Sequence, residues 1–313
     1  MNKPIQILDT IVQPGKKAII NLEVAKLHTA SPVNIPIIVE HSKKKGPTLL
    51  LLGGVHGDEI NGIEIVRKIV RSGLNKPQRG TIICIPVLNI FGFLNFMREL
   101  PDGRDLNRSF PGTASGSLAS QFAFAFMKHI APLADIIIDI HTGAAQRNNY
   151  PQIRCDFSNP QALELAEVFD APFIKDSKLI PKSLREAVSK KGKNIILFEG
   201  GKANRIDPFI LEEGIRGIKR VMHHLDMIDE CDDLQRGSTL LKNSKWLRSP
   251  LSGMFDLRVL NGSYVEKGTI IGVISDPFGK YERSFKSPMN GYIFAVNESP
   301  IVNKGDAIFH IGY

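Results

Sequence analysis

Several features that define other classes of protein are scarce in this sequence. Only three of its 313 residues are cysteine (Cys84, Cys155 and Cys231), and they are widely separated, with no CxxC pair. This spacing excludes a disulfide framework and a zinc knuckle, and it predicts reduced thiols in a cytoplasmic protein. The longest apolar run, around residues 49–52, is far shorter than the ~20 residues of a membrane-spanning helix. The N-terminal segment also lacks the apolar core of a signal peptide.

Acidic residues are outnumbered, since 40 Lys and Arg against 32 Asp and Glu give a formal net charge of +8. Lysines cluster at residues 43–45 and 190–193, but neither cluster is interleaved with aromatic residues. We therefore predict solvated loops at these positions, and neither a nucleic-acid nor a membrane partner. A positive field favours an anionic small-molecule substrate. The sequence does not decide between a monomer and a homo-oligomer.

Between about residues 48 and 225, short apolar runs alternate with amphipathic segments. Apolar runs predict buried strands at four places: 48–54, 81–89, 134–141 and 194–200. Amphipathic spacing predicts helices at two: about 58–73 and 117–130. Continuous apolar strands separated by helices indicate an α/β fold, with a mixed, largely parallel sheet flanked by helices. Ligands in such sheets bind beyond the carboxyl ends of the strands.

The C-terminal part of the chain contains an internal repeat. Residues 249–274 match residues 287–312, sharing SP..G at the start and V.KG before a final apolar run. Duplicated short strands predict a small all-β module of two interlocked halves, similar to the barrel-sandwich of lipoyl and biotinyl domains. The carrier-lysine motif of those domains is absent around Lys280. We therefore expect the module to cover the mouth of an active site, and we divide the chain into domains 1–235 and 236–313.

Three side chains with metal-ligand chemistry follow the predicted strands. His56 and Glu59 stand three apart just after the first apolar run, and His141 ends the third, two residues beyond Asp139. The HxxE spacing alone is a weak signal, because such pairs occur by chance. However, strand exits meet at one edge of a parallel sheet. Two imidazoles and one carboxylate with an open fourth position make a hydrolytic zinc site, with Asp139 as support for His141.

Further polar groups suited to catalysis lie downstream. Glu199 leaves the fourth apolar run and is followed by two glycines, a position that favours a proton-transferring base. A role as helix cap is disfavoured, because the next helix is expected to begin only near Pro208. Asn107 and Arg108 combine an amide with a guanidinium fork, which suits the grip of a substrate carboxylate.

The motifs HGDEINGIE, DLNRSFPG, DIHTG and FEGG, in this order and at these separations, resemble the succinylglutamate desuccinylase/aspartoacylase family. That family belongs to the zinc carboxypeptidase (M14-like) group. The resemblance spans roughly residues 20–313 and depends on all four motifs together. It implies a zinc hydrolase catalytic domain at 1–235, with Glu199 as general acid/base and Asn107 and Arg108 on a substrate carboxylate. It also implies one Zn²⁺ per chain with three ligands: His56, Glu59 and His141.

The resemblance leaves two arginine roles open. An arginine upstream of the Asn–Arg pair polarises the scissile carbonyl in this family. Arg98 is our choice, but the ELPDG stretch shifts the spacing and leaves Arg104 as the alternative. A further arginine ahead of the base is expected to bind the acyl carboxylate, and Arg185 and Arg154 both fit that place.

The activity implied by the resemblance is a zinc-dependent amidohydrolase, or deacylase, acting on an N-acyl amino acid or a related small N-acylated amine. One alternative is a metallocarboxypeptidase acting on small peptides, for which the same metal and Asn–Arg clamp would serve. A module that caps the cleft would exclude peptides. A second alternative is a binding protein that has kept the fold, against which the complete set of ligands and base argues. The sequence does not identify the acyl group.

Overall fold

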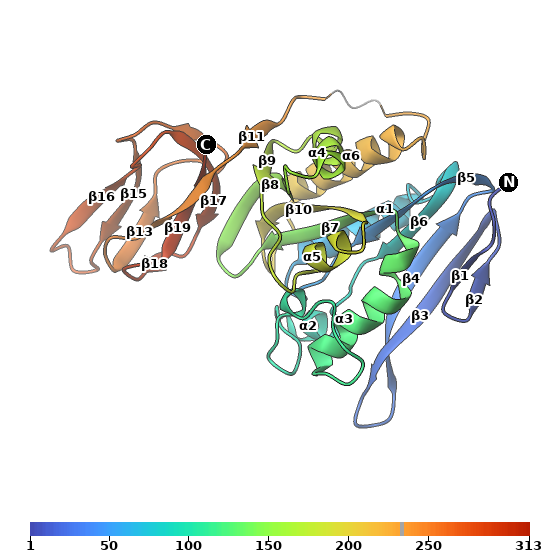
Figure 1. The fold of residues 1–313 in the computed structure, drawn as a ribbon. Coiled ribbons are helices and arrows are strands. Elements are labelled where there is room, and N and C mark those ends of the chain that lie inside the picture. Colours follow the sequence, from blue (N-terminus) through green and yellow to red (C-terminus); the bar gives the residue numbers. More distant parts are fainter. Residues whose placement is uncertain (232–234) are drawn as a thin grey trace.

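A computed structural model describes residues 1–231 and 235–313 of the chain. Its main feature is a 13-stranded mixed sheet in the order β12-β19-β17-β8-β10-β7-β5-β6-β4-β3, with β9, β11 and β14 paired beside this path (Figure 1). The strands up to residue 202 are β1 (Ile5–Ile7), β2 (Thr10–Val12), β3 (Lys16–Lys26), β4 (Pro32–His41), β5 (Lys44–Leu52), β6 (Arg79–Ile85), β7 (Ile136–Gly143), β8 (Arg147–Cys155), β9 (Phe173–Asp176) and β10 (Asn194–Lys202).

The centre of the sheet is parallel. Strands β6, β5, β7 and β10 pair in parallel, and β7 is buried along its whole length. Apolar residues can follow one another in such strands because helices cover both faces. Towards the edges, β4 pairs with β6 and β8 with β10 in antiparallel fashion. The predicted mixed α/β sheet is therefore confirmed, with parallel pairing concentrated where the apolar runs lie.

Helices form a layer on each face of the sheet (Figure 1). One layer packs into a core with β5, β7 and β10 and contains α1 (Ile60–Ser72), α4 (Pro160–Phe169) and α6 (Pro208–His224). The opposite layer contains α2 (Ile90–Asn95), α3 (Leu118–His129) and α5 (Leu184–Ser189). Both helices predicted from amphipathic spacing are present, and the helix expected near Pro208 is α6. Gly73 ends α1 in a left-handed conformation (φ 76°), and the Ser117 hydroxyl caps α3.

One predicted strand is shorter than expected. The apolar run 81–89 contributes to β6 only as far as Ile85. Pro86 follows and has no N–H to donate to the ladder. The remainder of the run leads into α2, which Asn89 caps by accepting a hydrogen bond from the Gly92 N–H at 2.8 Å. The end of the run therefore forms the connection to a helix that the apolar pattern did not reveal.

The C-terminal module is all-β, as predicted. Strands β16, β15, β13 and β18 form a four-stranded sheet of their own, whereas β17 pairs with β8 and so extends the main sheet. The predicted domain boundary at residue 235 follows directly on the undescribed residues 232–234 and stays a prediction. The strands are β11 (Thr239–Leu241), β12 (Ser244–Arg248), β13 (Gly253–Leu257), β14 (Tyr264–Val265), β15 (Ile270–Ser275), β16 (Glu282–Lys286), β17 (Gly291–Asn297), β18 (Ile301–Val302) and β19 (Ala307–Gly312).

The two repeats of the module are interlocked by equivalent hydrogen bonds. The N–H of Gly268 in the first repeat donates to the carbonyl of Ser287 in the second, and the N–H of Gly305 donates to the carbonyl of Ser249, both at 2.8 Å. Each serine is buried and turns its hydroxyl to a carbonyl two residues on. The shared SP and KG sequences are thus the places where the two halves of the module are joined by backbone hydrogen bonds.

Among the described residues, no helix combines the length and apolar character needed to cross a membrane. The three cysteines are unpaired, and Cys84 and Cys155 are buried. Burial raises the pKa of the Cys155 thiol to about 12, which keeps this group protonated and unreactive.

Candidate active site

The loop between β5 and α1 carries the first two ligand candidates, and its glycines explain its path. Gly54 has φ +59°, which favours glycine. At Gly57 a Cβ atom would lie 1.8 Å from the carbonyl carbon of Gly92, so the loop passes the backbone of α2 only with glycine there. This close approach fixes His56 and Glu59 between the sheet and α2.

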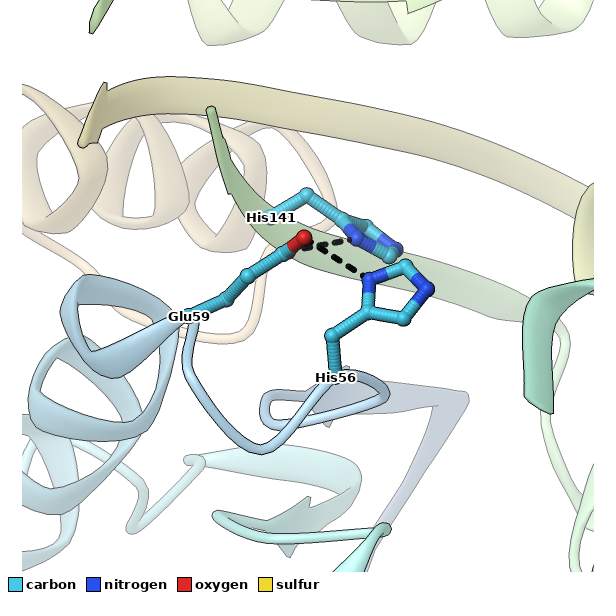
Figure 2. Close-up of side chains that lie close together, drawn as sticks. All are labelled: His56, Glu59 and His141. Carbon is cyan, nitrogen blue, oxygen red and sulfur yellow. Dashed lines mark hydrogen bonds and ion pairs between the residues drawn. The ribbon is translucent and has the colours of Figure 1, made fainter. Parts of the chain in front are cut away.

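His56, Glu59 and His141, hereafter the His–Glu–His group, are buried together (Figure 2). Their ligand atoms lie within 4.8 Å of one another. The Nδ1 atom of His56 is 2.8 Å from Glu59 Oε1, and the Nδ1 atom of His141 is 2.8 Å from Glu59 Oε2. The structure therefore brings the three predicted ligands to one point at the ends of β5 and β7.

Each imidazole is held from behind by a second carboxylate. The Nε2 atom of His56 lies 3.0 Å from Asp105 Oδ1, and the Nε2 atom of His141 lies 2.9 Å from Asp139 Oδ2. A carboxylate that accepts the Nε2 proton leaves the Nδ1 lone pair directed to the centre, an arrangement typical of metal-binding histidines. Asp139 takes the supporting position suggested by the sequence, whereas Asp105 was not foreseen although it precedes the Asn–Arg pair in the same motif.

The ionisable side chains of the His–Glu–His group shift one another's pKa values. Burial alone would lower the pKa of His141, but Asp139 and Glu59 raise it well above its usual value. Glu59 and Asp105 likewise raise the pKa of His56 against the effect of burial. Burial would raise the pKa of Glu59, yet the two histidines hold it well below its usual value. The group thus favours positive charge at its centre.

These residues fit a divalent metal ion. His56 Nδ1 is buried, and its 2.8 Å contact with Glu59 Oε1 is an ion-pair approach without a well-directed hydrogen bond among the described residues; a metal ion would supply the missing partner. Two imidazole nitrogens and one carboxylate are a known donor set of catalytic zinc, which keeps a further position open. A cation at this point would also take the place of the protons that the raised pKa values hold there.

Removing the carboxylate behind His56 tests this fit. We expect Asp105→Asn to weaken zinc affinity by about 10- to 100-fold, the usual effect of losing a group that orients a ligand. Competition with a chromogenic chelator measures the affinity directly. Asp102→Asn is the matched control, because Asp102 lies in the same loop but accepts from the Ala119 and Arg104 N–H groups outside the pocket. Equal affinity of the two variants would contradict the assignment.

Glu199 lies beside the group on the neighbouring strand, where it pairs in register with His141. Its Oε2 atom accepts a hydrogen bond from Asn149 Nδ2 at 2.7 Å, and Arg154 Nη1 lies 3.1 Å from its Oε1 atom. Strand β8 supplies both partners. Arg154, which the sequence proposed as a substrate ligand, is therefore engaged with the candidate base, and Asn149 was not foreseen.

The structure places the two candidate carbonyl-polarising arginines differently. Arg98 lines the pocket, with Nη1 at 3.0 Å from Glu59 Oε1 and Nη2 at 2.9 Å from Asp105 Oδ2. Arg104 has a side chain that is 65% exposed, and its Nε is 3.9 Å from Asp102. Arg104 does not line this pocket. Proximity to the candidate metal site therefore favours Arg98.

The remaining candidates surround the same cavity. Asn107 and Arg108 lie in the 3₁₀ turn Leu106–Arg108, where the Asn107 side chain accepts from the Leu184 N–H at 2.8 Å. Arg185 is buried and donates through Nη2 to Ser177 Oγ and the Lys178 carbonyl, while its Nη1 has no partner among the described residues. Arg185 therefore has a donor to spare for a ligand.

Apart from Arg104 and Asp139, the candidate site side chains line one cavity of about 510 Å³. The C-terminal module contributes Trp246 and His310 to its wall, and β8 contributes Arg147. The module therefore takes part in the pocket, in line with the expected position at its mouth. No local signal in the sequence marked His310 in the second repeat or Trp246 just before the first, although Trp246 is the single tryptophan of the chain.

Comparison with known proteins agrees with this geometry. Residues 45–225 match the model of the succinylglutamate desuccinylase/aspartoacylase catalytic domain. The N-alpha-acetyl-L-2,4-diaminobutyric acid deacetylase of Halomonas elongata is 30% identical over 290 residues, covering 88% of this chain and 84% of that protein. A succinylglutamate desuccinylase/aspartoacylase structure from Rhodobacter sphaeroides has a TM-score of 0.83 at 25% identity, covering 95% of this chain and 94% of the other. The product-bound ectoine utilization protein EutE of Ruegeria pomeroyi shares the fold, with a TM-score of 0.85 at 21% identity over 100% and 99% of the two chains.

The mixed sheet, the pocket at the ends of its parallel strands and the similarity to deacylases place this chain among the hydrolases of amide bonds. The matched family model covers more than half of the chain, and the relative from Halomonas elongata covers most of it. The chain belongs to the succinylglutamate desuccinylase/aspartoacylase family, which confirms the resemblance carried by the four motifs.

Proposed function

We propose that this chain is a zinc-dependent deacylase that hydrolyses the amide bond of an N-acyl amino acid or a related small N-acylated amine. The observation that carries this proposal is one cavity of about 510 Å³ that contains the His–Glu–His group, Glu199 and Arg98. Its volume suits a small molecule. The deacetylase from Halomonas elongata supports the same class of reaction.

The proposed reaction uses water to convert an amide into a carboxylate and an amine. The His–Glu–His group would hold the zinc ion, which would supply Lewis-acid chemistry at this site. Glu199 takes up the proton of the attacking water at a carboxylate oxygen and delivers it to the leaving nitrogen. Asn149 and Arg154 hold the two oxygens of Glu199, so this proton moves at a fixed place.

Further groups that line the same pocket hold the substrate. Arg98 stabilises the negative charge that develops on the carbonyl oxygen, and Asn107 and Arg108 grip the carboxylate of the amino acid. Trp246 and His310 of the C-terminal module form part of the pocket wall and so reduce the space for a longer peptide. Their position favours a small N-acyl substrate over the alternative of peptide cleavage by a metallocarboxypeptidase.

A substrate panel tests the proposal. Zinc-loaded protein is incubated with N-acetyl, N-succinyl and N-formyl amino acids and with dipeptides, and the released amine is measured. We expect release from at least one N-acyl amino acid, with a loss of at least about 100-fold on chelation and recovery with zinc. Faster cleavage of dipeptides would support the carboxypeptidase instead. Absence of both bound metal and turnover would support a binding protein.

A further inference from the structure

Strand β8 contains a fully buried glutamine beside the candidate base. Gln152 pairs in register with Glu199 on the neighbouring strand β10, and none of its surface is exposed. It does not line the cavity that contains Glu199. A polar side chain inside a sheet costs free energy unless its amide is hydrogen-bonded. The partners of Gln152 therefore indicate what this residue does.

Gln152 connects the C-terminal module to an arginine. Its Nε2 donates to the carbonyl of Tyr150 in its own strand at 3.4 Å and to the carbonyl of Phe294 in β17 at 3.5 Å. Its Oε1 accepts a hydrogen bond from Arg154 Nε at 3.4 Å. Strand β17 is the strand that joins the module to β8. Since the two carbonyls bind the NH₂ group of Gln152, its amide oxygen is directed to Arg154.

The guanidinium group of Arg154 is in turn bound at both ends. Its Nε donates to Gln152, and its Nη1 lies 3.1 Å from Glu199 Oε1, the only carboxylate within ion-pair distance of Arg154 among the described residues. Burial, and after it the charge of Arg154, lowers the pKa values of Lys175 and Arg185, so these cations lie near Arg154. An arginine among like charges is stabilised by a carboxylate partner, which Glu199 supplies.

The position of Glu199 in β10 explains why its carboxylate needs such partners. The pairing of β10 with both neighbouring strands shifts register directly after Glu199, and Gly201 has φ +76°. An irregularity of this kind interrupts the ladder and turns side chains to new directions. The direction of the Glu199 carboxylate therefore depends on Arg154 at Oε1 and Asn149 at Oε2. A base acts only when it lies within hydrogen-bond reach of the proton that it accepts.

We propose that Gln152 is a positioning residue of the deacylase: held by β17 of the C-terminal module, it orients Arg154, and Arg154 orients the carboxylate of Glu199. The inference deepens the proposed function and rests on it. It gives the module a second role besides its part in the pocket wall. It also assigns Arg154 to the base, whereas the sequence placed this arginine among the candidate ligands of a substrate carboxylate.

A double-mutant cycle in kcat tests whether Gln152 acts through Arg154. Methionine is similar in length to both side chains but provides neither their polar groups nor the charge. With zinc-loaded protein and a saturating N-acyl amino acid, we expect kcat to fall about tenfold in Gln152→Met and about 10- to 100-fold in Arg154→Met, with KM changed less than about threefold. Gln121→Met, at an exposed position on α3, is the matched control.

The double variant gives the decisive comparison. If Gln152 acts through Arg154, adding Gln152→Met to Arg154→Met lowers kcat no further. Losses that multiply would show that Gln152 acts independently of Arg154, and they would overturn the proposal. A change confined to KM in either single variant would overturn it as well.

Two substrates separate the positioning of the base from the binding of a substrate carboxylate. N-succinylalanine carries a carboxylate on its acyl group, whereas N-acetylalanine does not. We expect Arg154→Met to lower kcat by the same factor for both, because Glu199 acts on each. A rise in KM confined to N-succinylalanine would make Arg154 a substrate ligand and would contradict the proposal.

Arg154→Lys tests the chain of contacts if Gln152→Met does not fold. Lysine keeps the charge, but its single ammonium group cannot replace the Nε contact to Gln152 and the Nη1 contact to Glu199 together. The side chain of Arg154 is 26% exposed, so this position tolerates the exchange better than the fully buried Gln152. We expect Arg154→Lys to lower kcat at least about tenfold. A kcat equal to that of wild type would overturn the proposal.

Equilibrium unfolding examines the contacts without turnover. Urea midpoints are measured on metal-free protein for wild type, Gln152→Met, Arg154→Met and the double variant. Residues in contact lose less free energy of unfolding together than the sum of their separate losses, and we expect this result here. Additive losses would overturn the proposal. If no N-acyl substrate releases amine, the proposed deacylase activity fails, while this cycle still decides whether Gln152 holds Arg154.

Discussion

Glu199→Gln is expected to lower kcat by about 1,000-fold or more while zinc stays bound. The amide has nearly the shape of the carboxylate but cannot take up a proton, and general acid/base groups typically contribute between about 100- and 10,000-fold. Metal retention is expected because Glu199 is not part of the His–Glu–His group. Its loss affects both the uptake of the proton from water and its delivery to the amine.

The surroundings of Glu199 allow this substitution without loss of the fold. A glutamine side chain can keep its oxygen towards Arg154 Nη1, while Asn149 turns its amide to accept a hydrogen bond from the new NH₂ group. Released amine gives kcat, and elemental analysis gives the zinc content. Glu212→Gln, at an exposed position on α6, is the matched control. Turnover close to that of wild type in Glu199→Gln would show that the base is misassigned.

The central strands of the sheet were predictable because nearly all of their residues are buried in the apolar core. Residues of β7 are buried on both faces, so an unbroken apolar run was enough to identify the strand and its parallel neighbours. The same rule located His56, His141 and Glu199 at strand exits, although His141 stands 82 positions after Glu59. Long-range proximity could be inferred here because parallel strands end at the same edge of the sheet.

Strand β8 escaped prediction for the opposite reason. Its sequence, RNNYPQIRC, contains the side chains that hold Glu199 and line the pocket in place of an apolar run. Asn149 and Arg154 occupy strand positions that carry apolar residues elsewhere in the sheet. Polar residues that a strand contributes to a functional site interrupt the apolar run by which a buried strand is predicted. Such a strand is therefore harder to predict from the sequence.

The contribution of the C-terminal module was hidden in a different way. The repeat identified the module, and its SP and KG sequences do lock the halves together. However, Trp246 and His310 reach the pocket only because β17 pairs with β8 and extends the main sheet. Antiparallel pairing between strands more than 140 residues apart leaves no local mark in the sequence, since Ala295 pairs with Asn149.

Arg98→Met is expected to lower kcat by about 100- to 1,000-fold, the usual effect of removing a donor from a developing oxyanion. The structure places the Arg98 guanidinium against Glu59 and Asp105, at the edge of the candidate metal site. The kcat of each variant is measured at saturating zinc, with the metal content checked, because Arg98 also contacts these carboxylates. Retention of zinc together with a loss of kcat would identify a role in the reaction.

Arg104→Met is the matched control, and it decides the alternative that the sequence left open. Its exposed side chain lies outside the pocket, so we expect a change in kcat of less than about twofold, as for surface positions that carry no special contact. Arg98→Lys separates charge from shape, because lysine keeps the positive charge but cannot contact Glu59 and Asp105 through one planar fork. We expect it to fall between wild type and Arg98→Met. A larger loss in Arg104→Met than in Arg98→Met would transfer the role to Arg104 and would require the loop at residues 99–105 to close over the bound substrate.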